Sequence, residues 1–117
     1  MVMSMKFLCL AYGDEEGWNT LTEQEKEEVL AQDAIIAKRG NLMGPVRPEV
    51  TTISNWDGNL EVMAAPYAAV NKLPLAGFSV IEAQSIEEVI AMVADTPCAR
   101  ARGFIEVRPF WNTQPEA

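Results

Sequence analysis

Two helix-start signals constrain the fold of this chain more than any other feature. Thr22 with Glu25, and Ser85 with Glu88, have the Ser/Thr-x-x-Glu spacing of a capping box. In that motif each side chain satisfies a free backbone N–H of the first helical turn. The sequence therefore predicts two helices, each beginning at a defined residue.

The ends and buried faces of these helices are also indicated. Gly40 is expected to stop the first helix, which runs over residues 23–38, and Pro97 is expected to end the second. Apolar residues recur at helical spacing in both segments. The predicted buried residues are Val29, Leu30, Ala34, Ile36 and Ala37 in the first helix, and Ile86, Val89, Ile90 and Val93 in the second.

Apolar runs with strand character lie before, between and after the helices. They cover residues 5–12, 41–46, 50–56, 60–63, 76–83 and 104–110. Asp57-Gly58 is a strong hairpin-turn dipeptide between two of them. The order of strand, helix, several strands, helix and strand predicts an α+β fold, the ferredoxin-like split βαβ unit with both helices on one face of a sheet.

The face of the sheet away from the helices indicates self-association. In the last strand Ile105 and Val107 suit the helix side, which leaves Phe104, Glu106, Arg108 and Phe110 on the other side. The first strand offers this second face more apolar area than a solvated sheet normally shows. We therefore expect a homodimer in which two sheets pack face to face.

Length and charge bound the class of protein. The 117 residues suit one domain. The net charge of −8 provides little basic surface, so we expect neither nucleic acid nor an anionic membrane as partner. The apolar opening stretch, residues 7–12, is too short to span a bilayer and lacks the layout of a secretory signal, which favours a cytoplasmic protein.

Absent residue types restrict the chemistry. The chain has no histidine, so imidazole catalysis and imidazole metal ligation are excluded. Cys9 and Cys98 stand far apart, without the spacing of a redox or zinc motif, and are expected to be small buried hydrophobes. We expect no metal and no other cofactor.

Segments spread over most of the chain together resemble the YCII-related family, in particular its DGPF branch. They are residues 5–18, Pro66-Tyr67, residues 75–83 and residues 105–109. The resemblance implies a dimeric α+β barrel with a pocket in each subunit. It also implies that the fold starts at Met5, so that residues 1–4 extend a single domain spanning 1–117; residues 112–117 look like a tail.

The chain departs from the family at the signature itself. Where that signature reads Asp-Gly-Pro-Phe, the chain has Ala64-Ala65-Pro66-Tyr67. The resemblance implies lactone isomerase-like or dehydrochlorinase-like chemistry from a His and an Asp, and this chain has neither group at those positions. Any activity is therefore expected to use other residues, with Ala64 near the pocket as the vacated acid position.

One carboxylate and one tyrosine hydroxyl are the candidates for catalysis. Asp14 follows the first strand, from where its carboxylate can reach a pocket, and Tyr67 adds a hydroxyl to the signature aromatic. The structural alternative for Asp14 is a solvated acidic turn.

The candidates for ligand binding are Tyr12, Trp18, Arg47 and Ala64. Two of these residues also have an explanation without a ligand: Trp18 could be part of ordinary packing, and Arg47 could be a surface residue. Two function classes remain open: a module that binds a small organic molecule without catalysis, and a cofactor-free lyase, isomerase or oxygenase that uses Asp14 and Tyr67.

Overall fold

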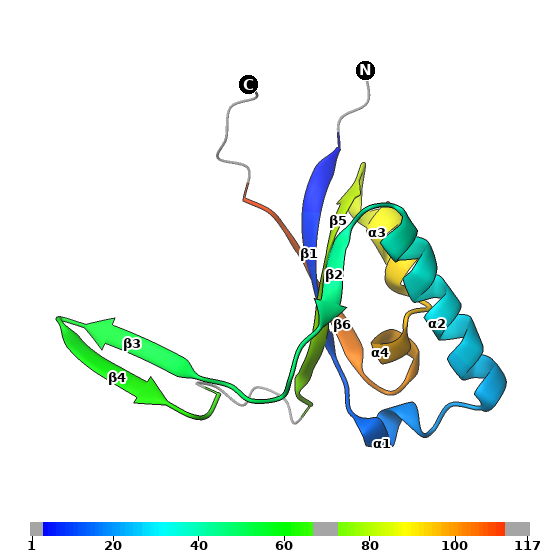
Figure 1. Ribbon diagram of the computed structural model, residues 1–117. Helices are drawn as coiled ribbons and strands as arrows, with labels where there is room; N and C mark the ends of the chain where they lie inside the picture. The colour runs from blue at the N-terminus through cyan, green and yellow to red at the C-terminus, as the bar shows by residue number, and fades with distance from the viewer. Residues whose placement is uncertain (1–3, 67–72, 112–117) are drawn as a thin grey trace.

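The computed structural model describes residues 4–66 and 73–111 and folds them into a layered α+β unit with a projecting hairpin (Figure 1). The strands are β1 (Met5–Tyr12), β2 (Leu42–Pro45), β3 (Thr52–Trp56), β4 (Asn59–Met63), β5 (Leu75–Ala83) and β6 (Phe104–Pro109). The helices are α1 (Glu15–Trp18), α2 (Glu23–Lys38), α3 (Ile86–Val93) and α4 (Pro97–Arg100).

Helix α2 begins and ends where its local signals predict. The Oγ1 of Thr22 accepts a hydrogen bond from the amide N–H of Glu25 at 3.0 Å, and the Oε1 of Glu25 accepts one from the N–H of Thr22 at 2.8 Å. Gly40, with a φ of +82°, adopts the left-handed conformation that terminates many helices. Both ends of α2 are therefore set by residues within or next to the helix.

Helix α3 differs from the prediction at both of its ends, and Ile86 and Ile90, which were predicted to be buried, are 37% and 54% exposed. Ser85 caps it by accepting from the N–H of Glu88 at 3.2 Å, but the Glu88 carboxylate accepts instead from the N–H of Gln84 at 2.8 Å. The helix ends at Val93, and Pro97 begins the separate short helix α4. Proline suits a first helical turn because it has no N–H to leave unsatisfied there.

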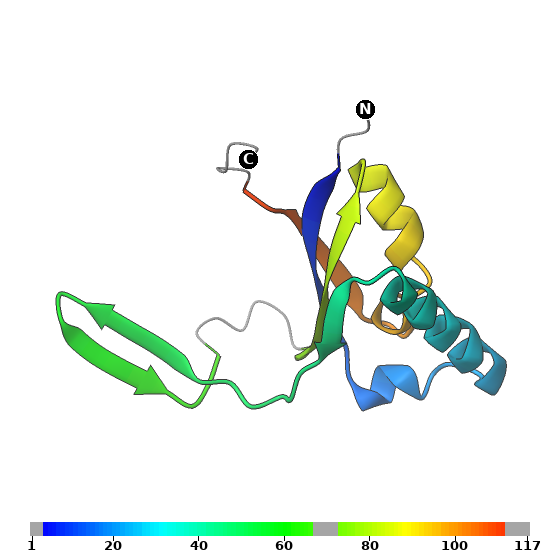
Figure 2. The ribbon, with the colours of Figure 1, turned by 45° about the horizontal axis from the view of Figure 1, so that its top comes forward.

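The main sheet has the strand order β2-β5-β1-β6, with all three pairings antiparallel. Both long helices cover one of its faces (Figures 1 and 2). This is the predicted ferredoxin-like arrangement. Helix α2 connects β1 to β2 and crosses over β5, and α3 leads from β5 toward β6 and crosses over β1.

Strands β3 and β4 form a separate two-stranded ribbon that projects away from the main sheet as an arm (Figure 2). Asp57 and Gly58, at φ values of 55° and 79°, make its two-residue turn. Positive φ at both central residues defines the type I′ turn that a right-handed ribbon favours. The hairpin predicted from Asp57-Gly58 is thus confirmed.

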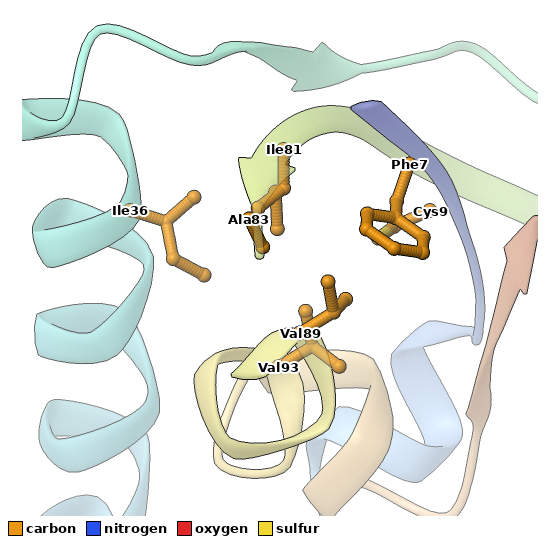
Figure 3. Close-up of a cluster of buried hydrophobic side chains, with 7 residues drawn as sticks. All are labelled: Phe7, Cys9, Ile36, Ile81, Ala83, Val89 and Val93. Atoms are coloured by element: carbon orange, nitrogen blue, oxygen red, sulfur yellow. The ribbon is translucent and has the colours of Figure 1, made fainter. Parts of the chain in front are cut away.

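The core lies between the sheet and the long helices. Figure 3 shows Val89 and Val93 of α3 pointing toward Phe7 of β1 and Ile81 of β5, with Ile36 of α2 at the side. Phe7, Ile36, Ile81 and Val89 are at most 2% exposed. Burial of these side chains provides the main favourable contribution to folding.

The predicted buried stripe of α2 is too wide. Val29 and Ile36 are buried, but Leu30 is 52% exposed, and Ala34 and Ala37 are also exposed. Leu30 and Ala37 each follow a buried residue by one position, which is about 100° around the helix. The helix therefore buries a narrow line, and that prediction was wrong for these three residues.

The opposite face of the sheet carries no helix (Figure 1). Because side chains alternate along a strand, this open face presents Leu8, Leu10, Tyr12, Phe78, Val80, Phe104, Glu106 and Arg108, with Leu42 at the edge. Leu42 is 66% exposed and Phe104 40% exposed.

Among the described residues, no helix is long and apolar enough to cross a membrane.

Candidate functional site

A cavity of about 570 Å³ lies between α2 and the helix-covered face of the sheet, and we call it the helix–sheet cavity. Its volume is within the range of small-molecule sites. Its lining comes from β1, α2, β2, β5, β6 and the segment from the end of α3 into α4. The lining residues are Cys9, Ala11, Asp33, Ala34, Ile36, Ala37, Met43, Gly44, Pro45, Ala76, Gly77, Phe78, Ser79, Val93, Thr96, Pro97, Cys98 and Ile105.

Small residues leave the space. Ala11 and Gly77 are register partners on the two central strands, near the end of β1 and the start of β5, and both line the cavity. Ala34 and Ala37 line it from the helix side and are themselves exposed, so the cavity opens to solvent alongside α2. The same alanines that fail to join the core therefore border the cavity entrance.

Few polar groups face this space. Ser79 is 8% exposed, and its hydroxyl forms a hydrogen bond with the Cys9 thiol. Thr96 donates its hydroxyl proton to the carbonyl of Val93 at 2.6 Å, so that donor is already used. The pKa of the Cys9 thiol is raised chiefly by burial, which keeps it protonated at neutral pH.

Asp33 is the charged residue of the lining. Its carboxylate forms no hydrogen bond or ion pair within the part of the chain that the structure describes. Burial raises the pKa of Asp33 because an apolar environment disfavours the charged form. Burial, and secondly the negative charge of Asp33, raises the pKa of the Cys98 thiol. A carboxyl group in such surroundings can exchange a proton with a bound molecule.

Asp14 and Trp18 share a second, smaller cavity of about 290 Å³. The Oδ1 of Asp14 accepts a hydrogen bond from the amide N–H of Gly17 at 2.9 Å and so caps α1. The ring of Trp18 packs beside Leu21, and the Lys26 ammonium lies 5.4 Å from its centroid. Asp14 therefore has a structural contact in addition to its place in the cavity wall.

The remaining residues predicted for the site lie elsewhere. Tyr12 is on the open face, where its hydroxyl donates to the Glu106 carboxylate at 3.1 Å. Arg47 is exposed and binds Glu49 through Nε at 3.2 Å and Nη2 at 3.0 Å. Ala64 is exposed just after β4.

Tyr12, Arg47 and Ala64 line neither of the two cavities. Tyr67 lies outside the described residues. The structure thus brings Asp14 and Trp18 together and keeps the other described candidates apart from them.

Sequence reasoning missed Asp33, although a signal was present. Asp33 follows the buried Val29 by four residues and precedes the buried Ile36 by three. Residues at these spacings share a helix face. An acidic side chain on the apolar line of a helix is a candidate for a site, because carboxylates are rarely buried without a partner.

Within the described residues, no group of three or more His, Cys, Asp or Glu side chains is placed to hold a metal ion.

Comparison with known proteins gives one result on the family. No protein of curated function matches the sequence. The family model described as the YCII-related domain matches residues 5–114, which cover both cavities, the projecting arm and every described strand and helix. This chain therefore belongs to the YCII-related domain family.

Proposed function

We propose that this protein binds a small organic molecule in the helix–sheet cavity, without the His and Asp chemistry that its resemblance to the family implied. The observation that carries the proposal is a cavity of about 570 Å³ with a largely apolar lining and one unpaired carboxyl group, Asp33. Small-molecule sites are usually built in this way, from apolar walls and a few polar groups that orient the ligand.

The second cavity extends the proposed site. Both cavities are lined by Ala76, Pro97 and Cys98, so they are neighbours that share this wall. A ligand longer than the helix–sheet cavity would therefore reach toward Asp14 and Trp18. These two residues keep a proposed role in ligand binding.

Acid–base catalysis without a cofactor is the second candidate function, and the position of Asp33 favours it. A carboxyl group whose pKa is raised by burial is suited to move a proton in an isomerase or lyase reaction. The sequence-based hypothesis gave this role to Asp14 and Tyr67. We place Asp33 first because the Asp14 carboxylate already accepts the Gly17 amide N–H.

Ligand binding is tested by titrating ¹⁵N-labelled protein with 7-hydroxycoumarin, a hydroxylated aromatic lactone, and following amide chemical shifts. Shifts are expected at Ala11, Asp33 and Gly77, which line the helix–sheet cavity. Ala34→Trp should abolish them, because the indole would fill the entrance. Ala31→Trp places the same side chain on an exposed position of α2 outside the cavity and should leave them unchanged.

Two outcomes contradict the proposal. In one, the shifts map to the open face of the sheet. In the other, Ala34→Trp and Ala31→Trp bind the probe equally well.

We also propose that the protein is a homodimer that pairs through the open face. The face is apolar over β1 and β5 and carries Glu106 and Arg108, whose carboxylate and guanidinium groups lie 3.6 Å apart. A two-fold interface must be self-complementary, and a patch that carries both signs of charge meets that condition.

We propose a cytoplasmic location as well. The two unpaired cysteines suit a reducing compartment, which supports it.

A further inference from the structure

The charges that face the two cavities are all of one sign. Asp33 lines the helix–sheet cavity, and Asp14 and Glu15 line the smaller one. No lysine or arginine is among the described residues that line either cavity. A bound anion would therefore meet carboxylates without any compensating cation.

Arg100, which lies close in sequence to the cavity wall, is already engaged in ion pairs. Arg100 follows the lining residue Cys98 by two positions, and its guanidinium lies within 3.7 Å of the carboxylates of Glu25, Glu28 and Asp95. These three contacts hold the Arg100 guanidinium beside Glu25 and Glu28 of α2 and beside Asp95. It is not available to neutralise Asp33 or to bind an acidic ligand.

The partial removal of the Asp33 carboxylate from water has a free-energy cost that no other group among the described residues offsets. An ionised group that is partly removed from water is unfavourable unless a partner of opposite charge or a set of hydrogen bonds replaces the lost hydration. The described residues offer Asp33 neither. A cationic ligand would supply the missing partner in an environment where the attraction is stronger than in water.

We infer that the ligand of the helix–sheet cavity is an amine with an apolar body, whose ammonium group pairs with the Asp33 carboxylate while its body packs against Ala11, Gly77 and Ala37. This inference rests on the proposed function and specifies its ligand class. Carboxylate- and phosphate-bearing molecules are disfavoured by the same charges.

The test compares three probes with the same apolar body: 3-phenylpropylamine, 3-phenylpropan-1-ol and 3-phenylpropionate. Dissociation constants are measured with the full chain by calorimetry, and the binding position is followed by amide chemical shifts. The amine is expected to bind about tenfold or more tightly than the alcohol, as is typical of a partly desolvated charged hydrogen bond. The carboxylate is expected to bind most weakly.

Matched variants assign the preference to Asp33. Asp33→Asn should remove the difference between amine and alcohol while leaving alcohol binding in place. Glu27→Gln removes one negative charge from an exposed position of the same helix, outside both cavities, and should preserve the difference. Retention of the amine preference in Asp33→Asn, or tightest binding of the carboxylate, would overturn the inference.

The outcomes separate this inference from the proposed function. Equal binding of amine and alcohol that Ala34→Trp abolishes would overturn the amine assignment and leave the cavity as a ligand site. Failure of all three probes to shift any amide of the cavity lining would overturn both.

Discussion

Gly103 shows how a single residue connects the two halves of the chain. A Cβ atom added there would overlap the carbonyl oxygen of Tyr12 and lie 2.8 Å from the carbonyl oxygen of Cys98. Both are backbone atoms, so neither can move without disturbing β1 or α4. Close approach of these segments, which shapes the wall shared by the two cavities, therefore requires glycine at this position.

Gly103→Ala is expected to lower the free energy of unfolding by at least about 2 kcal/mol, the cost of overpacking against rigid backbone. Urea denaturation measures this change. Gly44→Ala is the matched control, since nothing lies within 4 Å of a Cβ added there. Equal stability of the two variants would contradict the proposed contact.

Asp33 gives a pH dependence whose sign follows from its burial. Because the folded state raises the pKa of Asp33, the folded protein holds this proton more tightly than the unfolded chain does. The contribution of Asp33 to stability should thus fall as pH rises from about 3.9, the ordinary aspartate pKa, through the raised folded value. The thiols that share the cavity, Cys9 and Cys98, stay protonated over this range because their pKa values are also raised.

Asp33→Asn is consequently expected to be more stable than wild type at neutral pH, with the difference disappearing in acid. Thermal unfolding across this pH range measures the effect. The control Glu27→Gln, at an exposed position, should show no comparable gain. A constant difference at every pH would show that the ionisation of Asp33 is not its cause.

At the scale of elements, the start of α2 depends on contacts within one turn. Thr22 and Glu25 exchange two hydrogen bonds between side chain and backbone. Thr22→Ala should therefore destabilise the protein by about 1 kcal/mol, the usual cost of losing an N-cap. Chemical denaturation measures the loss, and Gln24→Ala, at an exposed position of the same turn, should lie near wild type.

The arm formed by β3 and β4 is an element without a core of its own. Ile53, Trp56, Leu60 and Val62 are between 60% and 72% exposed. A two-stranded ribbon is marginally stable in water unless it packs on something else. This apolar surface therefore supports the proposed homodimer.

At the scale of the whole molecule, self-association is the property that the exposed apolar surface predicts. We expect sedimentation analysis at micromolar concentration to give a dimer. Leu42→Asp places a charge at the edge of the open face and should weaken the dimer at least about tenfold. A buried unpaired charge costs more than the roughly 1.4 kcal/mol that corresponds to a tenfold change in the dissociation constant.

Leu30→Asp is the matched control for this experiment. Leu30 is exposed to a similar degree but lies on α2, on the other side of the sheet. It should leave the association unchanged. A wild-type monomer, or equal weakening by both variants, would contradict an interface on the open face.

The sequence determined the features whose physical cause is local. The capping pair Thr22 and Glu25, the positive φ of Gly40 and the Asp57-Gly58 turn involve residues within a few positions of one another, so their spacing alone predicted α2 and the β3–β4 hairpin, though not its projection from the main sheet. The alternation of side chains along β1 and β6 likewise separated the two faces of the sheet before their register was known.

Only the tertiary structure decided how α2 is rotated against the sheet. That rotation buries Val29 and Ile36, leaves Leu30 in solvent and turns Asp33 into a cavity bounded by β5 and α4. Helical spacing fixes which side chains share a face, but the volumes of distant residues such as Ala11, Gly77 and Cys98 fix which face is buried and where space remains. For that reason the sequence yielded the fold, while the helix–sheet cavity and its carboxyl group emerged from packing between segments far apart in the chain.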